Sequence, residues 1–296
     1  MRTQPTTLAA LSLLIGCSGG SFDQGSQLGV TDSDTGAEEA DTDTDSDTDT
    51  DTDTDTDTDT DTDADVDEGC VNAFHPIHTA DWSKTYDATY EGETATATES
   101  GRAPEGEGVY RYQDAILNTS NEGYNTVVRV ACDPDGSEGM YMLGWDGTVT
   151  VPGLIPSFPL EFNVSATHSS PRRYLSPEYA FGNEGSWSYT YTLTMVDVDK
   201  GSTLITYNVD GTYTDAGTEQ LTLFNGDVVT AYKLTNNFLF TETSNPIGGE
   251  EIDGYIEQWW VKGLGLVKEV YRDESAGTIL LSKDLTGYTG LEVIDD

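Results

Sequence analysis

The sequence predicts an all-β domain, built as an antiparallel curved sheet, an open barrel or a sandwich and preceded by a disordered acidic linker. Alternating apolar and polar residues recur after residue 70, and Asn-Gly or Asp-Gly pairs separate several of these runs. No window of about ten residues follows the 3.6-residue period of a helix. The chain therefore divides into a signal peptide at 1–16, a tether at 17–69 and one domain at 70–296.

The first segment has the features of a bacterial export signal. Arg2 gives a positive start, and residues 8–15 form an apolar run too short to span a bilayer. The run ends in Leu14-Ile15-Gly16-Cys17, which resembles the lipobox of bacterial lipoproteins at every position. The resemblance implies a diacylglycerol on the Cys17 thiol, cleavage before Cys17 and acylation, palmitate for example, of the new amino group. The alternative is an ordinary secretory signal with a cysteine nearby.

The lipobox resemblance also implies a location in the cell envelope. Two or three acyl chains, at about 0.8 kcal/mol per buried methylene, would anchor the chain in a membrane permanently. Ser18 follows Cys17, at the place where an aspartate retains enterobacterial lipoproteins in the inner membrane. Ser18 therefore indicates the outer membrane, with the periplasmic and the outward face both open.

The segment from Ser18 to Gly69 is predicted to be a disordered spacer. Residues 41–63 alternate Asp with Thr almost strictly, so neither face is apolar and a strand would stack like charges. The segment would span about 170 Å fully extended and about 40 Å as a flexible coil. Weak association with Ca²⁺ is possible for so many carboxylates, but the run lacks the glycine turn and carbonyl ligands of a calcium loop, which favours a solvated spacer.

The charge of the chain excludes some partners. Residues 1–69 hold 20 of the 54 acidic side chains and one of the 13 basic ones, which leaves 34 acids, 12 bases and a charge of −22 on the domain. A surface this negative repels phosphates, so nucleic acid and anionic lipid head groups are excluded as partners. Cationic partners and divalent ions remain compatible with it.

Four runs carry the strand prediction most clearly, at residues 124–132, 160–165, 187–195 and 232–240. In the third run, for example, Trp, Tyr, Tyr, Leu and Met alternate with Ser and Thr, the pattern of a sheet with one buried face. The turns between strands are also visible. Asn225-Gly226 is typical of a type I′ hairpin turn, and Asp146-Gly147 and Asp210-Gly211 suggest similar turns between less clearly framed strands.

Two cysteines remain once Cys17 carries lipid. Cys70 opens the domain and Cys132 ends a strand-like run with an inward side chain. In an oxidising compartment such a pair predicts a disulfide, worth about 2–4 kcal/mol, although two free buried thiols are the alternative.

The C-terminal region is similar to the TapB-like families of exported bacterial proteins. The similarity rests on residues 225–234, Asn-Gly-Asp-Val-Val-Thr-Ala-Tyr-Lys-Leu, and 257–269, where Gly263, Gly265 and Lys268 match. It implies a curved antiparallel sheet and transfers no catalytic residue. From the residues themselves, Gly263 and Gly265 predict a bulge or bend. Adjacent Trp259 and Trp260 should point to opposite faces, one into the core and one over an edge or groove.

No catalytic set is recognisable. His75 and His78 are the closest histidine pair and His168 is distant, which favours surface histidines over a zinc site. Asp and Gly in residues 133–138 and 197–201 favour plain turns over calcium loops. No nucleophile, phosphate-loop or dinucleotide motif occurs, so the sequence predicts no enzyme, no metal and no cofactor.

The sequence leaves three functions open. The first is a non-enzymatic envelope lipoprotein whose curved sheet binds a protein partner or an apolar ligand. A surface carbohydrate-binding or adhesive module is the second, and it requires exposed Trp or Tyr rings, since the chain has 5 Trp and 16 Tyr. The third is a hydrolase, which requires convergent polar groups with shifted pKa values.

Overall fold

The computed structural model describes residues 74–75, 80–106, 108–132, 139–151, 160–175, 181–244, 249, 251–273 and 277–294. The predictions for the signal peptide, Cys17, the tether, Cys70, His78 and residues 133–138 lie outside the described residues. The backbone of Cys132 lies at the end of a strand, but its side chain is not described. The Cys70–Cys132 disulfide therefore stays a prediction.

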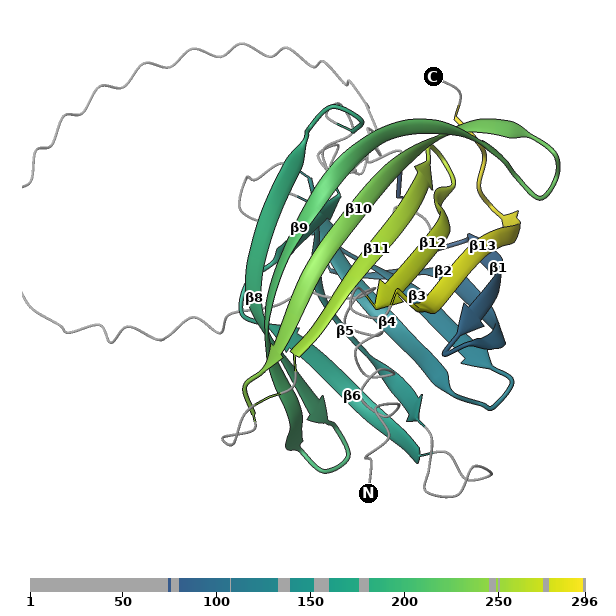
Figure 1. Ribbon diagram of the computed structural model, residues 1–296. Helices are drawn as coiled ribbons and strands as arrows, with labels where there is room; N and C mark the ends of the chain where they lie inside the picture. The colour runs from purple at the N-terminus through teal and green to yellow at the C-terminus, as the bar shows by residue number, and fades with distance from the viewer. Residues whose placement is uncertain are drawn as a thin grey trace, which may run out of the picture. The chain divides into compact units, whose positions relative to one another are not determined.

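The described residues form thirteen strands and no helix (Figure 1). None of them, accordingly, belongs to a helix that could cross a membrane. The strands are β1 Ser83–Tyr90, β2 Glu93–Gly106, β3 Val109–Asn118, β4 Gly123–Cys132, β5 Met140–Val151, β6 Leu160–His168, β7 Arg172–Leu175, β8 Ser186–Asp197, β9 Ser202–Thr222, β10 Val228–Glu242, β11 Glu251–Val261, β12 Gly265–Asp273 and β13 Ile279–Thr289.

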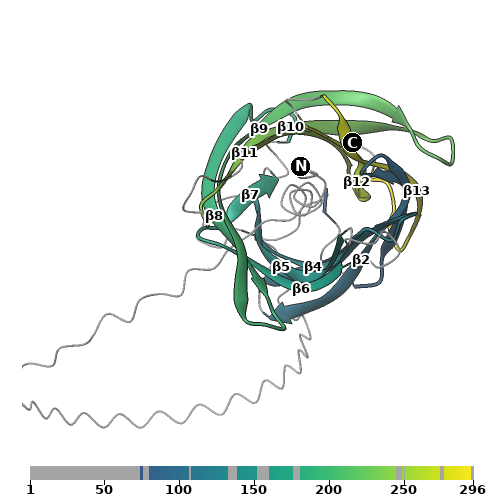
Figure 2. The same ribbon diagram turned by 60° about the horizontal axis from the view of Figure 1, so that its bottom comes forward.

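Twelve of these strands form a closed antiparallel barrel, seen along its axis in Figure 2. Strands β1–β6 and β8–β13 pair with their neighbours in chain order, and β1 pairs with β13 to close the ring. The short strand β7 adds to β5 beside β6. The predicted all-β antiparallel class is confirmed, and among the predicted architectures the chain adopts a barrel that is closed rather than open.

Alternation along each strand separates the inside of the barrel from the outside. In β1, Tyr86, Ala88 and Tyr90 are buried, whereas Asp87 and Thr89 between them are exposed. Eight-stranded barrels are narrow enough for ordinary side chains to fill, so a twelve-stranded barrel is wider. This width explains why so many inward positions carry tyrosine, tryptophan or a long charged side chain.

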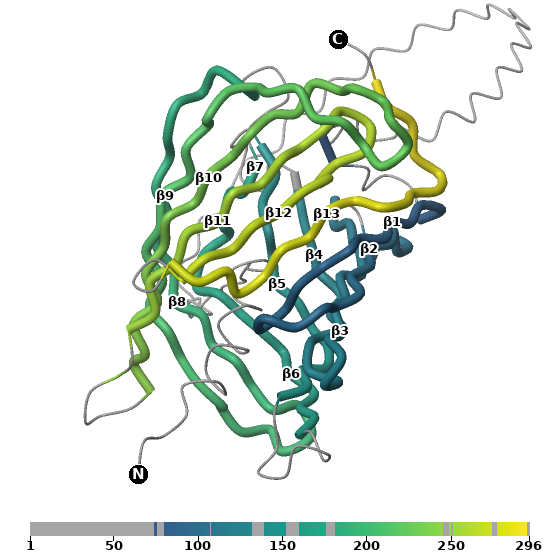
Figure 3. The backbone as a smooth tube through the Cα atoms, turned by 45° about the vertical axis from the view of Figure 1, so that its right-hand side comes forward, coloured from purple at the N-terminus to yellow at the C-terminus, as the bar shows by residue number. Residues whose placement is uncertain are grey.

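The hairpin predictions have different outcomes. Asn225-Gly226 does join β9 to β10, but through a loop of residues 223–227, because the last strand pair is Thr222 with Val228. The predicted hairpin is therefore confirmed, but the prediction of a two-residue type I′ turn was wrong. This hairpin extends beyond the end of β11 (Figure 3), and Phe224 at its tip contacts Tyr288 of β13, with ring centres 5.9 Å apart.

The other two turn predictions were wrong. Asp146-Gly147 lies in the middle of β5, and Asp210-Gly211 lies in the middle of β9. At both places glycine is required by a close neighbour in the adjacent strand. A Cβ on Gly211 would collide with the ring of Tyr189, its register partner in β8, so the tyrosine occupies the space that the glycine leaves.

The predicted bend at Gly263 and Gly265 is confirmed as the turn between β11 and β12. Both glycines have positive φ, 79° and 78°, and a register shift follows directly between Trp259 and Trp260. The two tryptophans do point to opposite faces. Trp260 lines a cavity inside the barrel, while Trp259 donates to Glu219 of the β9–β10 hairpin.

The turn between β1 and β2 predicts a pH-dependent stability. Glu91 has a positive φ of 52° and a partly buried carboxyl, and burial together with Glu122 raises the pKa of Glu91 from 4.5 to about 7. The folded state thus favours the protonated acid, so stability should fall as pH rises from about 5 to about 7. Replacing Glu91 by glutamine should stabilise the protein by about 1 kcal/mol at pH 8, after allowing for solvent screening.

Urea unfolding at pH 8 and pH 4.5 measures this difference. At pH 4.5 the wild-type carboxyl is protonated in the folded state, so the two proteins should have nearly equal stability. An equal gain at both pH values would mean that titration of Glu91 is not the cause.

Candidate functional site

Four charged side chains from neighbouring strands meet inside the barrel. The strand register sets Lys84 of β1 opposite Glu99 of β2, and Glu99 opposite Asp114 of β3. Lys283 reaches the group from β13, on the other side of β1. All four side chains are at most 7% exposed, so water contributes little to their solvation.

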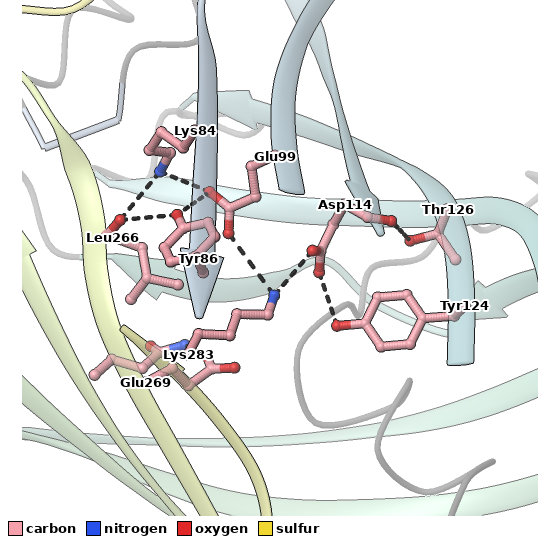
Figure 4. Close-up of polar contacts among 10 residues, drawn as sticks. Lys84, Tyr86, Glu99, Asp114, Tyr124, Thr126, Leu266, Glu269 and Lys283 are labelled. Carbon is pink, nitrogen blue, oxygen red and sulfur yellow. Dashed lines mark hydrogen bonds and ion pairs between the residues drawn. The ribbon is translucent and has the colours of Figure 1, made fainter. Parts of the chain in front are cut away.

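The four groups form a connected network (Figure 4). The ammonium nitrogen of Lys84 lies 2.6 Å from Glu99 Oε2 and donates to the backbone oxygen of Leu266 at 3.2 Å. The nitrogen of Lys283 lies 2.9 Å from Asp114 Oδ1 and 3.9 Å from Glu99 Oε1. Lys283 therefore bridges the two carboxylates, which would otherwise repel each other.

Two phenols complete the shell around these carboxylates. The hydroxyl of Tyr86 donates to Glu99 at 2.8 Å, and the hydroxyl of Tyr124 donates to Asp114 at 3.1 Å. A buried charge is tolerated only where it is paired and hydrogen-bonded, and both carboxylates meet that condition.

The network pushes the pKa values of its two acids apart. Burial works to raise the pKa of Glu99, but Lys84 and Lys283 together outweigh it and hold that pKa below its ordinary value. Burial prevails at Asp114 and raises the pKa of that carboxyl despite Lys283. Burial also lowers the pKa of Lys84, against the attraction of Glu99. Two acids whose pKa values are shifted in opposite directions are typical of general acid–base pairs, and also of buried structural networks.

A third buried cation lies inside the barrel, in addition to Lys84 and Lys283. The guanidinium of Arg172 in β7 donates to the hydroxyls of Tyr191, at 3.4 Å, and Tyr213. Its central carbon lies 5.1 Å from the ring centre of Tyr189. Beside it, burial and then Arg172 lower the pKa of His168 well below its ordinary value. His168 is therefore neutral at pH 7, and Arg172 alone carries the positive charge here.

Residues 74 and 75, which precede β1, pack inside the barrel as well. Phe74 and His75 are 0% and 5% exposed. The ring of His75 lies 5.0 Å from Tyr112 of β3, 6.1 Å from Tyr174 of β7 and 6.0 Å from Trp260 of β11, measured between ring centres. The chain just after the proposed tether thus joins strands from opposite parts of the wall.

These groups enclose one small cavity of about 20 Å³, enough for about one water molecule. A cavity of this size has no room for an organic substrate beside Glu99 and Asp114. The cavity is lined by His75, Lys84, Glu99, Tyr112, Asp114, Met142, Arg172, Tyr174, Tyr213, Gln258, Trp260, Gly265, Leu266, Glu269 and Lys283.

Some residues singled out in the sequence take other roles. His75 and His168 are buried, 5% and 3% exposed, so the prediction of surface histidines was wrong for both. Residues 197–201 form the predicted plain turn. Asp197 accepts the backbone N–H groups of Asp199 and Lys200 at 3.1 Å, and its carboxylate pairs with the Lys200 ammonium at 2.5 Å.

The buried network was not predicted from the sequence, although a signal was present. Lys84, Glu99, Asp114 and Lys283 each stand at the apolar phase of an alternating strand, as in Tyr112-x-Asp114-x-Ile116. A charged residue in that phase indicates an inward-facing ion pair.

Two shallow grooves that the described residues form lie on the outer face of the barrel. A shallow groove of about 500 Å³ crosses β8–β11 and contains Thr190, Asp210, Asn237 and Asp253. A second groove of about 490 Å³ crosses β2–β6 and is rich in threonine. Every described Trp and Tyr is buried or half-buried, so neither groove has the exposed aromatic rings that a sugar-stacking surface requires.

Comparisons with known proteins give distant likenesses. No family model and no curated protein matches the chain, so the similarity to TapB-like proteins rests on its residues alone. A solved structure assigned as a lipoprotein of Parabacteroides distasonis is 15% identical with a TM-score of 0.46, over 73% of this chain and 98% of its own. An exported protein with a YmcC-like fold from Bacteroides fragilis is 13% identical with a TM-score of 0.43, over the same shares.

Proposed function

We propose that this chain is an exported lipoprotein, anchored by lipid on Cys17, and that its barrel is a non-enzymatic module that binds a protein partner. The lipobox residues 14–17 support the anchor, and Ser18 supports the outer membrane as its location. The acidic tether at 17–69 would hold the barrel away from the membrane surface by about 40 Å or more.

The position of open space is the observation that supports this function best. Among the described residues the interior cavity holds about one water molecule, whereas the outer face offers grooves of about 500 Å³. The small volume of this cavity argues against a hydrolase site here, and its polar lining argues against an apolar ligand at the same place. We therefore propose that the partner binds on the outer face of the barrel.

The groove across β8–β11 also indicates the chemistry of the partner. Asp210 and Asp253 line it, and the domain as a whole carries a charge of −22. A partner with lysine or arginine side chains would gain attraction in approaching this face, and the attraction should weaken with salt.

Photo-crosslinking in the native host tests the proposal. A photoreactive amino acid at Asn237, an exposed position in the groove, should give one discrete protein adduct in the envelope fraction. The same amino acid at Asp87, exposed on β1 outside the groove, is the matched control and should give none. Both proteins should fractionate as the wild type does.

Native mass spectrometry on the same full-length preparations separates the carrier function from the partner function. The proposal expects the native mass of the free protein to equal the mass of the polypeptide with its acyl groups. An additional organic molecule that is released on denaturation, together with no adduct at Asn237, would contradict the proposal and assign the barrel to a carrier.

A further inference from the structure

Three buried hydrogen-bond donors without a partner belong to residues that line the interior cavity. They are Arg172 Nε, the hydroxyl of Tyr174 and the indole Nε1 of Trp260. Their residues are only 2%, 3% and 4% exposed, and they come from β7 and β11, on different parts of the wall. Leaving such donors unpaired costs about 1–3 kcal/mol each, so their gathering at one cavity indicates an occupant.

One of the cations that line the cavity, Arg172, has no carboxylate partner among the described residues. Glu99 and Asp114 are bound by the two lysines, and Glu269 accepts a hydrogen bond from Gln258 at 2.6 Å. Arg172 is bound only by phenol groups, and no ion pair joins it to a carboxylate among the described residues. A buried guanidinium without a counter-charge is unfavourable, and an anion beside it removes that cost.

The size and chemistry of the cavity restrict the anion further. A volume of about 20 Å³ fits one particle of about the size of a water molecule. Arg Nε–H and indole N–H can only donate, so the occupant must accept from both while also accepting from the phenol. We propose that the cavity is a binding site for a small monovalent anion of halide size, with Arg172 as its charge partner and Trp260 and Tyr174 as additional donors.

Chloride and bromide are the probes for this site, because both are monovalent hydrogen-bond acceptors and bromide can be located in crystals by its anomalous scattering. The mature chain with Cys17→Ser, which needs no detergent, is unfolded by heat at constant ionic strength in sodium chloride or sodium gluconate. Gluconate is too large for the cavity. We expect saturable stabilisation by chloride, reaching about 5–10 °C near 100-fold excess over its Kd, and a bromide peak beside Arg172 Nε.

Variants of the cavity-lining residues, together with a control variant at a partly exposed site, make the test specific. Tyr174→Phe removes one donor with almost no change in volume, whereas Trp260→Phe removes one donor and also enlarges the cavity. Each should weaken chloride binding at least about threefold. Arg172→Gln should abolish it. Arg173→Gln is the matched control, because Arg173 in the same strand pairs with Glu184 at a partly exposed site and should keep the full chloride effect.

Two results would overturn the assignment. One is equal thermal stability in chloride and gluconate with no bromide peak, which would leave a water molecule as the occupant. The other is a chloride effect that Trp260→Phe and Tyr174→Phe leave unchanged, which would place the anion elsewhere. Tyr174→Phe changes only one hydroxyl, so the test does not depend on whether Arg172→Gln or Trp260→Phe folds.

Discussion

Replacing Lys283 by methionine should lower the free energy of unfolding by about 3–5 kcal/mol at pH 8. The ammonium of Lys283 is 1% exposed and bridges Asp114 and Glu99 inside the barrel. Removal of one partner leaves a carboxylate buried without its counter-charge, which costs far more than the ion pair itself contributes. The loss should be smaller at pH 5, because Asp114 can then take up a proton instead of remaining charged.

Lys268→Met is the matched control for this prediction. Lys268 pairs with Asp284 at 3.1 Å, but the two side chains are 35% and 58% exposed, so its replacement should cost at most about 1 kcal/mol. Urea unfolding of the two variants beside the wild type measures both values. Similar small losses for Lys283→Met and Lys268→Met would show that the buried network is not a main support of the barrel.

Gly147→Ala should cost about 3 kcal/mol, at the upper end of the range for overpacked sites. An added Cβ would collide with the backbone oxygen of Asn125 and lie 2.6 Å from the Cα of Thr126, both in strand β4. Backbone atoms cannot rotate away as a side chain can, so β4 and β5 must move apart and weaken their hydrogen bonds. Chemical denaturation and amide hydrogen exchange of β4 measure the two effects.

Gly106→Ala is the control for that substitution, because a Cβ at Gly106 meets no atom within 4 Å. It lies at the end of β2 and should change stability by less than about 1 kcal/mol. If Gly147→Ala were as mild as Gly106→Ala, the close pairing of β4 with β5 would be refuted.

The sequence predicted the strands well because their alternation is local information. Strands β4, β6, β8 and β10 each contain a run that was recognised from its alternating pattern, and the all-β class follows from such runs. The closed ring could not be predicted in the same way. It depends on β1 pairing with β13, for example Ser83 with Thr289, and alternation does not indicate which distant strands will pair.

The two uses of glycine in β proteins explain why two of the turn predictions were wrong. Asp146-Gly147 and Asp210-Gly211 have the composition of hairpin turns, but their glycines serve close approach between adjacent strands. A dipeptide pattern cannot distinguish the two uses, because each depends on which residue lies across the strand pair. The buried network was not predicted for a related reason. A lysine at an inward position can be recognised as part of an ion pair only when the strand register shows which carboxylate lies beside it.

The proposed location of the protein and the proposed role of the tether both depend on a lipid anchor at Cys17. Digestion of the purified mature protein before aspartate should release the hexapeptide Cys17–Phe22, since Asp23 is the first aspartate of the chain. Mass spectrometry of that peptide should show a diacylglycerol on the Cys17 sulfur and a free or acylated amino terminus at the same residue. An N-terminal peptide that starts elsewhere, or one with an unmodified Cys17 thiol, would contradict the account.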